Sequence, residues 1–482
     1  MKIQKYMIVL AVLALFFTAC KDWLDVKPKT EIDAERLYER ESGFKQVLTG
    51  AYTSLCGASM HGREMTFGMV DALGGVYPVT GGGVYSHVRA YDYEEAEVEA
   101  LISATWSASY NTITNLNHMI SYLRKADRGM FAEDNYNVIL GEALGLRAFI
   151  HFDLLKLFAP SYKANKDAVS IPYVTQYKFN VTPQYTVSAV MDSILVDLTE
   201  AAGLLELSDP LVTGREITVR DDDGYLQNRE FRFNYYAVRT VMARLHMWKG
   251  ETAKAAQYAQ EVIRSNRFRW VSFDEVATPD AASRDRTFSP EHVFVLQDMN
   301  IVNNYAGVLK RPAFNYMSGS NLLFSPAYLA GLFTTSDDWR RMYLWAEEGS
   351  AGTDLSSTKL WQYEEMPAEF KYRQPLIRLP ELYLILAETM LDTDPDGAAE
   401  LISTMMANRG IAGGVPPGST TEEVRNAMVM EYRREFLCEG IMFYYFKRLD
   451  SATIDGAAAG AFTKDKYVLP MPTAELEFGN RE

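Results

Sequence analysis

Seven charged residues lie inside segments that are otherwise apolar and helix-like, and acid–base chemistry is the reaction that their types would allow. They are Arg147, Arg378, Glu381, Glu388, Arg433, Glu435 and Glu439. Two carboxyl groups act as general acid and base only where they share a cleft. Charges within apolar helices more often form ion pairs that tie helices together and set their packing. We therefore predict structural ion pairs at these positions rather than a catalytic site.

Other catalytic and metal-binding patterns are weak. The six histidines, His61, His87, His118, His151, His246 and His292, have no metal-ligand spacing, and no Gly-x-Ser-x-Gly occurs. The glycines at 81–83 are not followed by the lysine of a phosphate-binding loop. The acids at 221–223 lack the alternation of an EF-hand and favour a hairpin turn, although a loose Ca²⁺ site stays open. We expect no metal, no cofactor and no enzymatic activity.

Cys20 is placed for covalent lipid attachment. Lys2 and Lys5 precede an apolar run over 7–17 that is too short to span a bilayer, and the small residues at 18 and 19 follow it. A cysteine directly after such residues resembles a bacterial lipobox, in which the cysteine is acylated and becomes the mature N-terminus. Phe17 stands where that signal usually has leucine. We predict a signal peptide over 1–19, lipidation at Cys20 and an extended tether over 20–34; an ordinary signal peptide is the alternative.

Composition and charge exclude several classes of protein. The chain has 482 residues, of which 48% are hydrophobic and 23% charged, as in ordinary globular proteins. Its net charge is −15, and without the two lysines of the signal peptide it is −17, which argues against nucleic-acid binding. After the signal peptide, no apolar run is long enough for a transmembrane helix. Cys56 and Cys438 are expected as buried free thiols, with a disulfide between them left open.

Apolar residues at helical spacing predict a mostly α-helical protein. The predicted helices cover 35–56, 98–125, 135–159, 187–207, 233–249, 252–265, 380–391, 397–408 and 421–448. Two pairs, joined at Gly250 and at 394–396, have the organisation of tetratricopeptide-like helical hairpins, although no strict 34-residue repeat is present. The helix over 135–159 is apolar around most of its circumference and should be buried on nearly all sides.

Long loops interrupt this helical scaffold. Residues 74–93 are rich in glycine and tyrosine, residues 213–233 suggest a small β-hairpin, and residues 266–375 show little regular pattern. Loops of that length commonly carry function, and the 29 tyrosines suit flat, amphipathic ligand contacts. We predict one domain over 35–482, in which the helices support an irregular, loop-rich ligand-binding half at about 266–375.

Several ordered motifs resemble the SusD/RagB family of outer-membrane nutrient-binding lipoproteins of Bacteroidetes. They are the start at 20–28, the aromatic-and-Asn helix at 106–120, the "LRA…F.L…F" helix over 143–158, the segments 377–388, 433–440 and 447–449, and the ending at 469–472. Asp338 and Arg340 resemble a structural acid–base pair of the family. Residues 441–446 lack the Arg and Asp that many members have there, which marks a divergent branch.

The resemblance implies a SusD-like fold and a non-enzymatic role. It implies a lipid-anchored protein facing outward on the outer membrane, which captures an oligosaccharide and delivers it to a SusC-like TonB-dependent transporter. A peptide ligand, as in RagB-like members, is the first alternative. A surface glycoside hydrolase and a scaffold without a small ligand are the others.

Ligand contacts are placed by position in the family rather than by motif. In starch-binding members they lie in an early loop and in the irregular middle of the chain, here 68–95 and 297–345. The candidates are Asp71, Tyr77, Tyr85, Arg89, Tyr91, Asn304, Tyr305 and Tyr316. Packing within the loop is the alternative for each tyrosine. Trp345 and Trp361 lie in apolar segments and are expected in the core.

Overall fold

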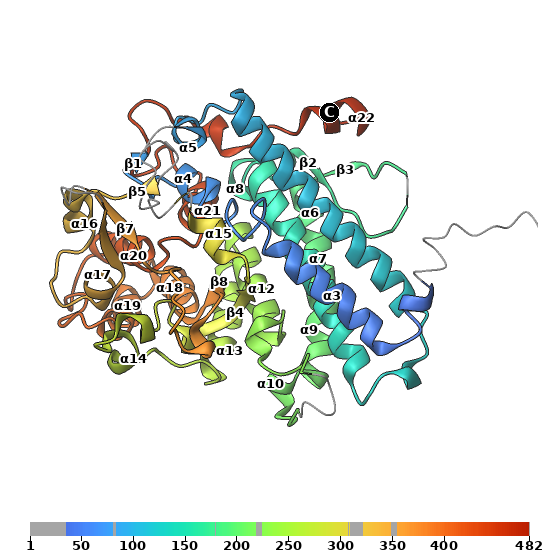
Figure 1. Cartoon of the computed structure of the whole chain (residues 1–482). Helices are drawn as coiled ribbons and strands as arrows, with labels where there is room; N and C mark the ends of the chain where they lie inside the picture. The colour runs from blue at the N-terminus through green and yellow to red at the C-terminus, as the bar shows by residue number, and fades with distance from the viewer. Residues whose placement is uncertain are drawn as a thin grey trace, which may run out of the picture.

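The computed structural model describes residues 35–80, 83–178, 180–217, 224–306, 308, 322–348 and 354–481, and most of them are helical. Figure 1 shows long helices lying side by side on one side of the molecule and short elements gathered on the other. The longer helices are α3 (Glu41–Leu55), α6 (Ala96–Leu123), α7 (Asn135–Phe158), α9 (Val187–Ser208), α12 (Tyr235–Lys249), α13 (Thr252–Arg264), α18 (Leu379–Met390), α19 (Pro395–Ala407) and α20 (Thr421–Glu435).

These helices pack on one another in chain order. Contacts run from α3 to α6, α7, α9, α12, α13, α18, α19 and α20 in turn. The turn between α12 and α13 is at Gly250, whose positive φ of 74° ends α12 in the left-handed conformation that glycine tolerates. The predicted scaffold of helical hairpins is therefore confirmed.

Helix α7 is buried over nearly its whole length, as its all-round apolar sequence predicts. Gly141 and Gly145 let neighbouring segments approach its backbone closely. A Cβ atom at Gly141 would lie 2.6 Å from Leu205 of α9, and one at Gly145 would lie 2.6 Å from Phe233. Close packing of α7 against α9 thus depends on Gly141, and its close packing against Phe233 depends on Gly145.

The predicted helix over 421–448 is wrong, because it is two helices. Helix α20 ends at Glu435, and α21 (Met442–Arg448) begins after a turn. Cys438 and Gly440 have positive φ values of 66° and 71° in that turn. A side chain at Gly440 would also place its Cβ 2.5 Å from the carbonyl oxygen of Met65, so the bend brings the chain against an earlier loop.

The loop-rich regions contain more regular structure than their sequence indicates. Strand β4 (His292–Gln297) pairs antiparallel with β8 (Arg373–Arg378), and β6 (Trp345–Glu348) pairs with β7 (Asp354–Ser357). The four apolar residues at 293–296 are fully buried, which explains why β4 lacks the alternation of a half-exposed strand. Of the predicted hairpin over 213–233, residues 218–223 lie outside the described part of the chain.

The remaining elements are short. They are α4 (Met69–Leu73), β1 (Val79–Thr80), α5 (Val84–Arg89), α8 (Tyr162–Asn165), β2 (Val169–Pro172), β3 (Gln184–Thr186), α10 (Pro210–Thr213), α14 (Phe273–Ala277), α15 (Ile301–Ala306), β5 (Leu322–Leu323), α16 (Pro326–Leu332), α17 (Trp339–Tyr343) and α22 (Thr473–Phe478). Short 3₁₀ turns, such as Ser289–Glu291, connect them.

Cys56 and Cys438 are free thiols, as expected, with Cys438 buried and Cys56 half-buried. Burial raises the pKa of both thiols, that of Cys438 to about 12, so both stay protonated and unreactive at neutral pH. Within the described residues, no helix is both long and apolar enough to cross a membrane.

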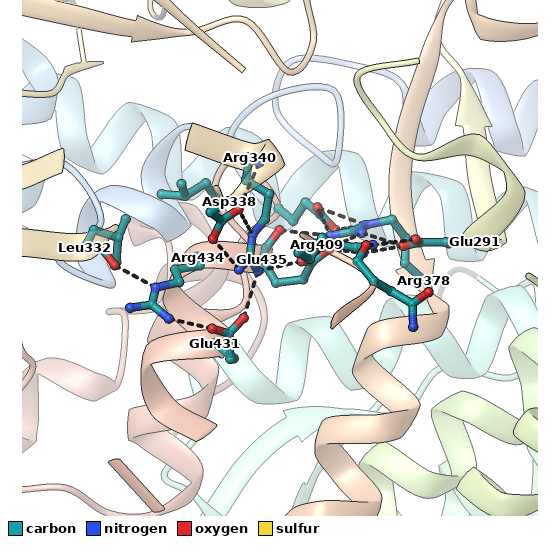
Figure 2. A network of polar contacts seen from close by, with 12 residues as sticks. Glu291, Leu332, Asp338, Arg340, Arg378, Arg409, Glu431, Arg434 and Glu435 are labelled. Carbon is teal, nitrogen blue, oxygen red and sulfur yellow. Dashed lines mark hydrogen bonds and ion pairs between the residues drawn. The ribbon is translucent and has the colours of Figure 1, made fainter. Parts of the chain in front are cut away.

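Buried charges join the loop-rich half to the helices (Figure 2). We call this set the central ion network; it consists of Glu291, Asp338, Arg340, Arg378, Arg409, Glu431, Glu435 and Glu439. Glu435 lies at its centre. One of its oxygens accepts from Arg378 at 2.6 Å and Arg409 at 2.8 Å, and the other from Arg340 at 2.9 Å.

The electrostatics of the network follow from this geometry. Burial by itself would raise the pKa of the Glu435 carboxyl, but Arg409, Arg378 and Arg340 outweigh it and hold that pKa well below its usual range. Glu291 accepts from Arg409 at 2.7 Å and from Arg378 at 3.3 Å, so Arg409 is shared by two carboxylates and Arg378, which also binds Glu439, by three. The three arginines of the network face five carboxylates, and Lys359 and Arg434 supply two further cations in an interior where an unpaired charge would be costly.

Other buried pairs complete the prediction of structural ion pairs. Arg147 binds Asp197 with two nitrogens at 2.7 Å, which ties α7 to α9. Arg244 of α12 binds Glu381 of α18 at 2.5 and 2.6 Å. The predicted pair of Asp338 and Arg340 is present, at 2.7 and 3.0 Å. Each pair joins different segments or fixes a turn, so the structural interpretation of these charges is confirmed.

Replacing Arg378 by alanine should lower the free energy of unfolding by about 3–5 kcal/mol, because it leaves the buried carboxylates of Glu435 and Glu439 undercompensated. Urea unfolding followed by circular dichroism measures this change. The matched control is Arg425→Ala, whose partner Asp392 is 83% exposed and whose pair should contribute less than about 1 kcal/mol. Equal losses in the two variants would contradict a structural role for the network.

Candidate functional site

The structure brings the two candidate segments of the sequence together. Strand β1 pairs antiparallel with β5, with Val79 opposite Leu323. Next to this pair, the rings of Tyr77 and Phe324 lie 5.2 Å apart. Figure 1 shows β1, α4 and α5 beside β5 at the loop-rich side of the molecule. The early loop and the middle of the chain therefore form one face.

The candidate tyrosines of the early loop are buried beneath this face. Tyr77, Tyr85 and Tyr91 are exposed by no more than 3%. The Tyr77 hydroxyl donates to the carbonyl of Phe67 at 2.7 Å, and the Tyr91 hydroxyl donates to the carbonyl of Leu73 at 2.7 Å. Both bonds hold the loop onto itself. In this conformation the rings pack within the protein, and their assignment as ligand contacts stays a prediction.

The polar candidates of the early loop differ in their access to solvent. Asp71 is fully buried and accepts from the backbone N–H of Gly440 at 3.0 Å, which fixes α4 to the turn after α20. Burial raises its pKa well above the usual range. Arg89 is half-buried and donates to the carbonyls of Pro78 at 3.2 Å and Gly456 at 3.4 Å. Of the early-loop candidates, Arg89 is therefore the one that reaches the surface.

The candidates of the middle segment lie on and beyond α15. Asn304 is buried and donates to Asp298 at 2.8 Å and to the carbonyl of Cys56 at 3.1 Å. The Tyr305 hydroxyl accepts from the backbone N–H of Gln362 at 3.3 Å. Tyr316 lies outside the described residues. Asn304 thus anchors α15 to the helical half, whereas Tyr305 points toward the segment after β7.

That segment supplies residues that the sequence did not identify as candidates. Trp345 and Trp361, both expected in the core, pack against it but are only partly buried. The Trp361 ring lies 6.5 Å from that of Tyr363. The Arg286 guanidinium stands 4.7 Å above the Tyr363 ring. We call Arg286, Tyr305, Trp361, Gln362 and Tyr363 the aromatic–arginine cluster. The alternation of aromatic and polar residues at 361–363 is the signal that could have indicated it.

Two nitrogens of Arg286 make no hydrogen bond to the described residues. One of its nitrogens, Nη2, donates to the carbonyl of Ala281, whereas Nε and Nη1 have no partner among the described residues. Burial lowers the pKa of this guanidinium, although it stays far above neutral pH. Aromatic rings can stack on the C–H face of a sugar, and free N–H groups can donate to its hydroxyls. Arg286 is 4% exposed and its two unbonded N–H groups are buried, so the half-buried rings of Trp361 and Tyr363 are the part of the cluster open to a glycan in this structure.

Hydrolytic chemistry has less support from the described residues. The carboxylates that were considered as acid–base pairs, Glu381, Glu388, Glu435 and Glu439, are each bound to an arginine. Within the described ranges, no group of three or more His, Cys, Asp or Glu residues is arranged to hold a metal ion.

Three comparisons with known proteins agree with this fold. Residues 22–212 match the family model of SusD-like proteins described as "Starch-binding associating with outer membrane". A SusD-like protein of Formosa agariphila is 20% identical, covering 94% of this chain and 92% of that protein.

Solved structures are similar over most of the chain. A SusD superfamily protein of Bacteroides thetaiotaomicron is 20% identical with a TM-score of 0.72, and 92% of this chain and 99% of that chain are covered. A SusD-like carbohydrate binding protein of Bacteroides vulgatus is 18% identical with a TM-score of 0.69, and 92% and 96% are covered. At these identities the structural matches establish the fold.

Asp285, which precedes the cluster, gives a pH-dependent prediction. Burial raises its pKa to about 6, against the opposing hydrogen bonds from the backbone and hydroxyl of Ser289 at 2.6 and 2.7 Å. The folded state then binds more protons than the unfolded state between about pH 4 and pH 6, so this group makes stability fall as pH rises through that window.

The Asp285→Asn side chain is neutral at every pH. The difference in free energy of unfolding between this variant and the natural chain should therefore shift in favour of the variant by about 2 kcal/mol as the pH rises from 4.5 to 7, and should stay constant above pH 7. Urea unfolding of both proteins across this range measures the difference. A difference that is the same at every pH would show that the Asp285 pKa is not raised.

Proposed function

This chain belongs to the SusD/RagB family, and from that premise we propose that it is a non-enzymatic cell-surface lipoprotein that captures an oligosaccharide and delivers it to a SusC-like TonB-dependent transporter. The family is one of starch-binding proteins associated with the outer membrane. A related structure is named as a carbohydrate binding protein. The proposed ligand is a glycan.

One observation carries the proposal beyond the family. The aromatic–arginine cluster places two partly buried rings, Trp361 and Tyr363, beside a guanidinium with unbonded N–H groups. Tyr305 of the cluster lies on α15, in the same middle segment as β5, which pairs with β1 of the early loop. Stacking on the rings would hold a sugar without any residue needed to cleave it, and donation from the buried Arg286 would require its side chain to turn toward the ligand. Arg89 of the early loop, which is half-buried, is a second donor in this proposal.

The Trp361→Ala and Tyr363→Ala variants should each weaken binding of a retained polysaccharide by about tenfold, because each loses a stacking surface. Affinity electrophoresis through gels that contain the polysaccharide measures the change in mobility. Tyr185→Ala is the control, since that ring is 42% exposed on β3, away from the cluster. Unchanged retention of both cluster variants would place the glycan site elsewhere.

The membrane anchor is tested separately. Cys20 lies outside the described residues, and its lipidation is part of the proposal. Lipid attachment at this position requires the cysteine thiol, which alanine lacks. Cys20→Ala should move the protein from the membrane fraction to the soluble fraction in cells that express it, as measured by fractionation and immunoblotting. Continued partition with the membrane would contradict lipidation at this residue.

A further inference from the structure

A cavity lies in the helical half, and its lining shares no residue with the aromatic–arginine cluster. Its volume is about 90 Å³, and residues of α7, α12, α18, α20 and α21 line it together with the loop after α3. The lining carries three cations, Lys156, Arg244 and Arg448. It also carries three carboxylates, Asp153, Glu381 and Glu439. A cavity with so many charged groups differs from the apolar voids that stay dry in protein cores.

Each of those carboxylates already has cationic partners. Asp153 accepts from Lys156 at 2.6 Å and from His61 at 2.9 Å. Glu381 accepts from Arg244 at 2.5 and 2.6 Å. Glu439 is bound by Arg378 and by Lys359, which lie outside the lining. The carboxylates are therefore neutralised, and repulsion of a negative ligand is correspondingly reduced.

Buried polar groups on the cavity wall are left without protein partners. The Tyr444 hydroxyl and His61 Nδ1 have no hydrogen-bond partner among the described residues. Both side chains are buried, with Tyr444 9% and His61 4% exposed. Lys156 binds Asp153 and lies 4.0 Å from the centre of the Tyr444 ring. Unsatisfied buried groups cost free energy unless water or a ligand completes them.

Donors dominate among the groups that remain open. Lys156 has one carboxylate partner for three N–H groups, and Arg244 uses Nε and Nη2 but not Nη1 in its bonds to Glu381 and Leu376. The Tyr444 hydroxyl is a further donor. A solute rich in acceptor oxygens would satisfy these groups, whereas one rich in N–H groups would not.

The approach to the cavity carries charges of both signs. A surface groove of about 360 Å³ shares Met247, Trp248 and Arg448 with the cavity wall, so the two voids adjoin. Four cations and two carboxylates line this groove: Lys163, Lys249, Arg425, Arg448, Glu388 and Asp392. Three of these cations are paired, Arg448 with Glu388, Arg425 with Asp392 and Lys249 with Asp192 outside the lining, so the groove is close to neutral and does not repel an anion. Arg448 lines both voids, and it binds Glu388 of the groove at 2.7 and 2.8 Å.

We propose that this cavity is a binding site for a small carboxylate of about the size of acetate, held by Lys156, Arg244 and the Tyr444 hydroxyl. Its volume of about 90 Å³ suits a solute of about four heavy atoms. The site is independent of the proposed glycan function. Binding would join α7, α12 and α21 and stabilise the helical half against unfolding.

Thermal unfolding and titration calorimetry of residues 21–482 with sodium acetate test this proposal. A solute with four heavy atoms, such as acetate, should have a dissociation constant no lower than about 40 µM, so the acetate titration extends to tens of millimolar. Acetate should raise the melting temperature more than sodium chloride at the same ionic strength. Acetamide, which has the same shape without the charge, should bind at least tenfold more weakly. Equal effects of acetate and chloride, or of acetate and acetamide, would overturn the proposal.

The Tyr444→Phe variant separates binding from a structural role. Since the hydroxyl has no protein partner, its removal should leave the melting temperature without acetate unchanged, while the acetate affinity falls about tenfold. Tyr110→Phe is the matched control; it loses a bond to the carbonyl of Pro172 outside the cavity and should keep the full acetate response. A Tyr444→Phe protein that binds acetate as the natural chain does would contradict the assignment. If either variant fails to fold, calorimetry on the natural chain still decides whether the protein binds acetate.

Discussion

The loop-rich half depends on one interaction, the binding of the buried Glu435 carboxylate by three arginines. Glu435 ends α20, and it meets Arg378 at the end of β8, Arg409 after α19 and Arg340 on α17. These segments are far apart in the sequence but converge on one buried carboxylate (Figure 2). An interior charge is tolerated only when its partners are fixed in place, so the network specifies one arrangement of these segments.

The same network reaches the ligand-binding face through the turn after α20. Arg378 binds Glu439, and the next residue, Gly440, donates its backbone N–H to Asp71 of α4. Asp71 belongs to the early loop, whose strand β1 pairs with β5. A continuous series of buried polar contacts therefore connects the helical hairpins to the early loop and, through the pairing of β1 with β5, to the middle segment. Rigid support of this kind reduces the entropy that ligand binding must overcome.

Helical elements were predictable from the sequence because periodic apolar residues define them locally. Helix α7 is the clearest example, since its all-round apolar sequence implies the burial that the structure has. The break between α20 and α21 was not predictable in the same way, because residues 436–446 are mostly apolar and the turn lies against the distant carbonyl of Met65. Strand β4 was missed for a related reason, as a strand buried on both faces has no alternation.

The site was predictable only by region. Positional analogy identified two segments that do form one face, but it could not tell which side chains point outward. Tyr77 and Tyr91 turn inward to bond the backbone, whereas Trp361, in an apolar context, is only partly buried. Side-chain direction in irregular loops depends on tertiary contacts that no local pattern encodes.

The most direct test of the account is to run residues 21–482 through native gels that contain a panel of glycans, while measuring reducing ends released in parallel incubations. Retardation by a polysaccharide with no release of reducing ends is the result that a capture protein predicts. Release of reducing ends from a retained polysaccharide would contradict it, because the protein would then be a hydrolase.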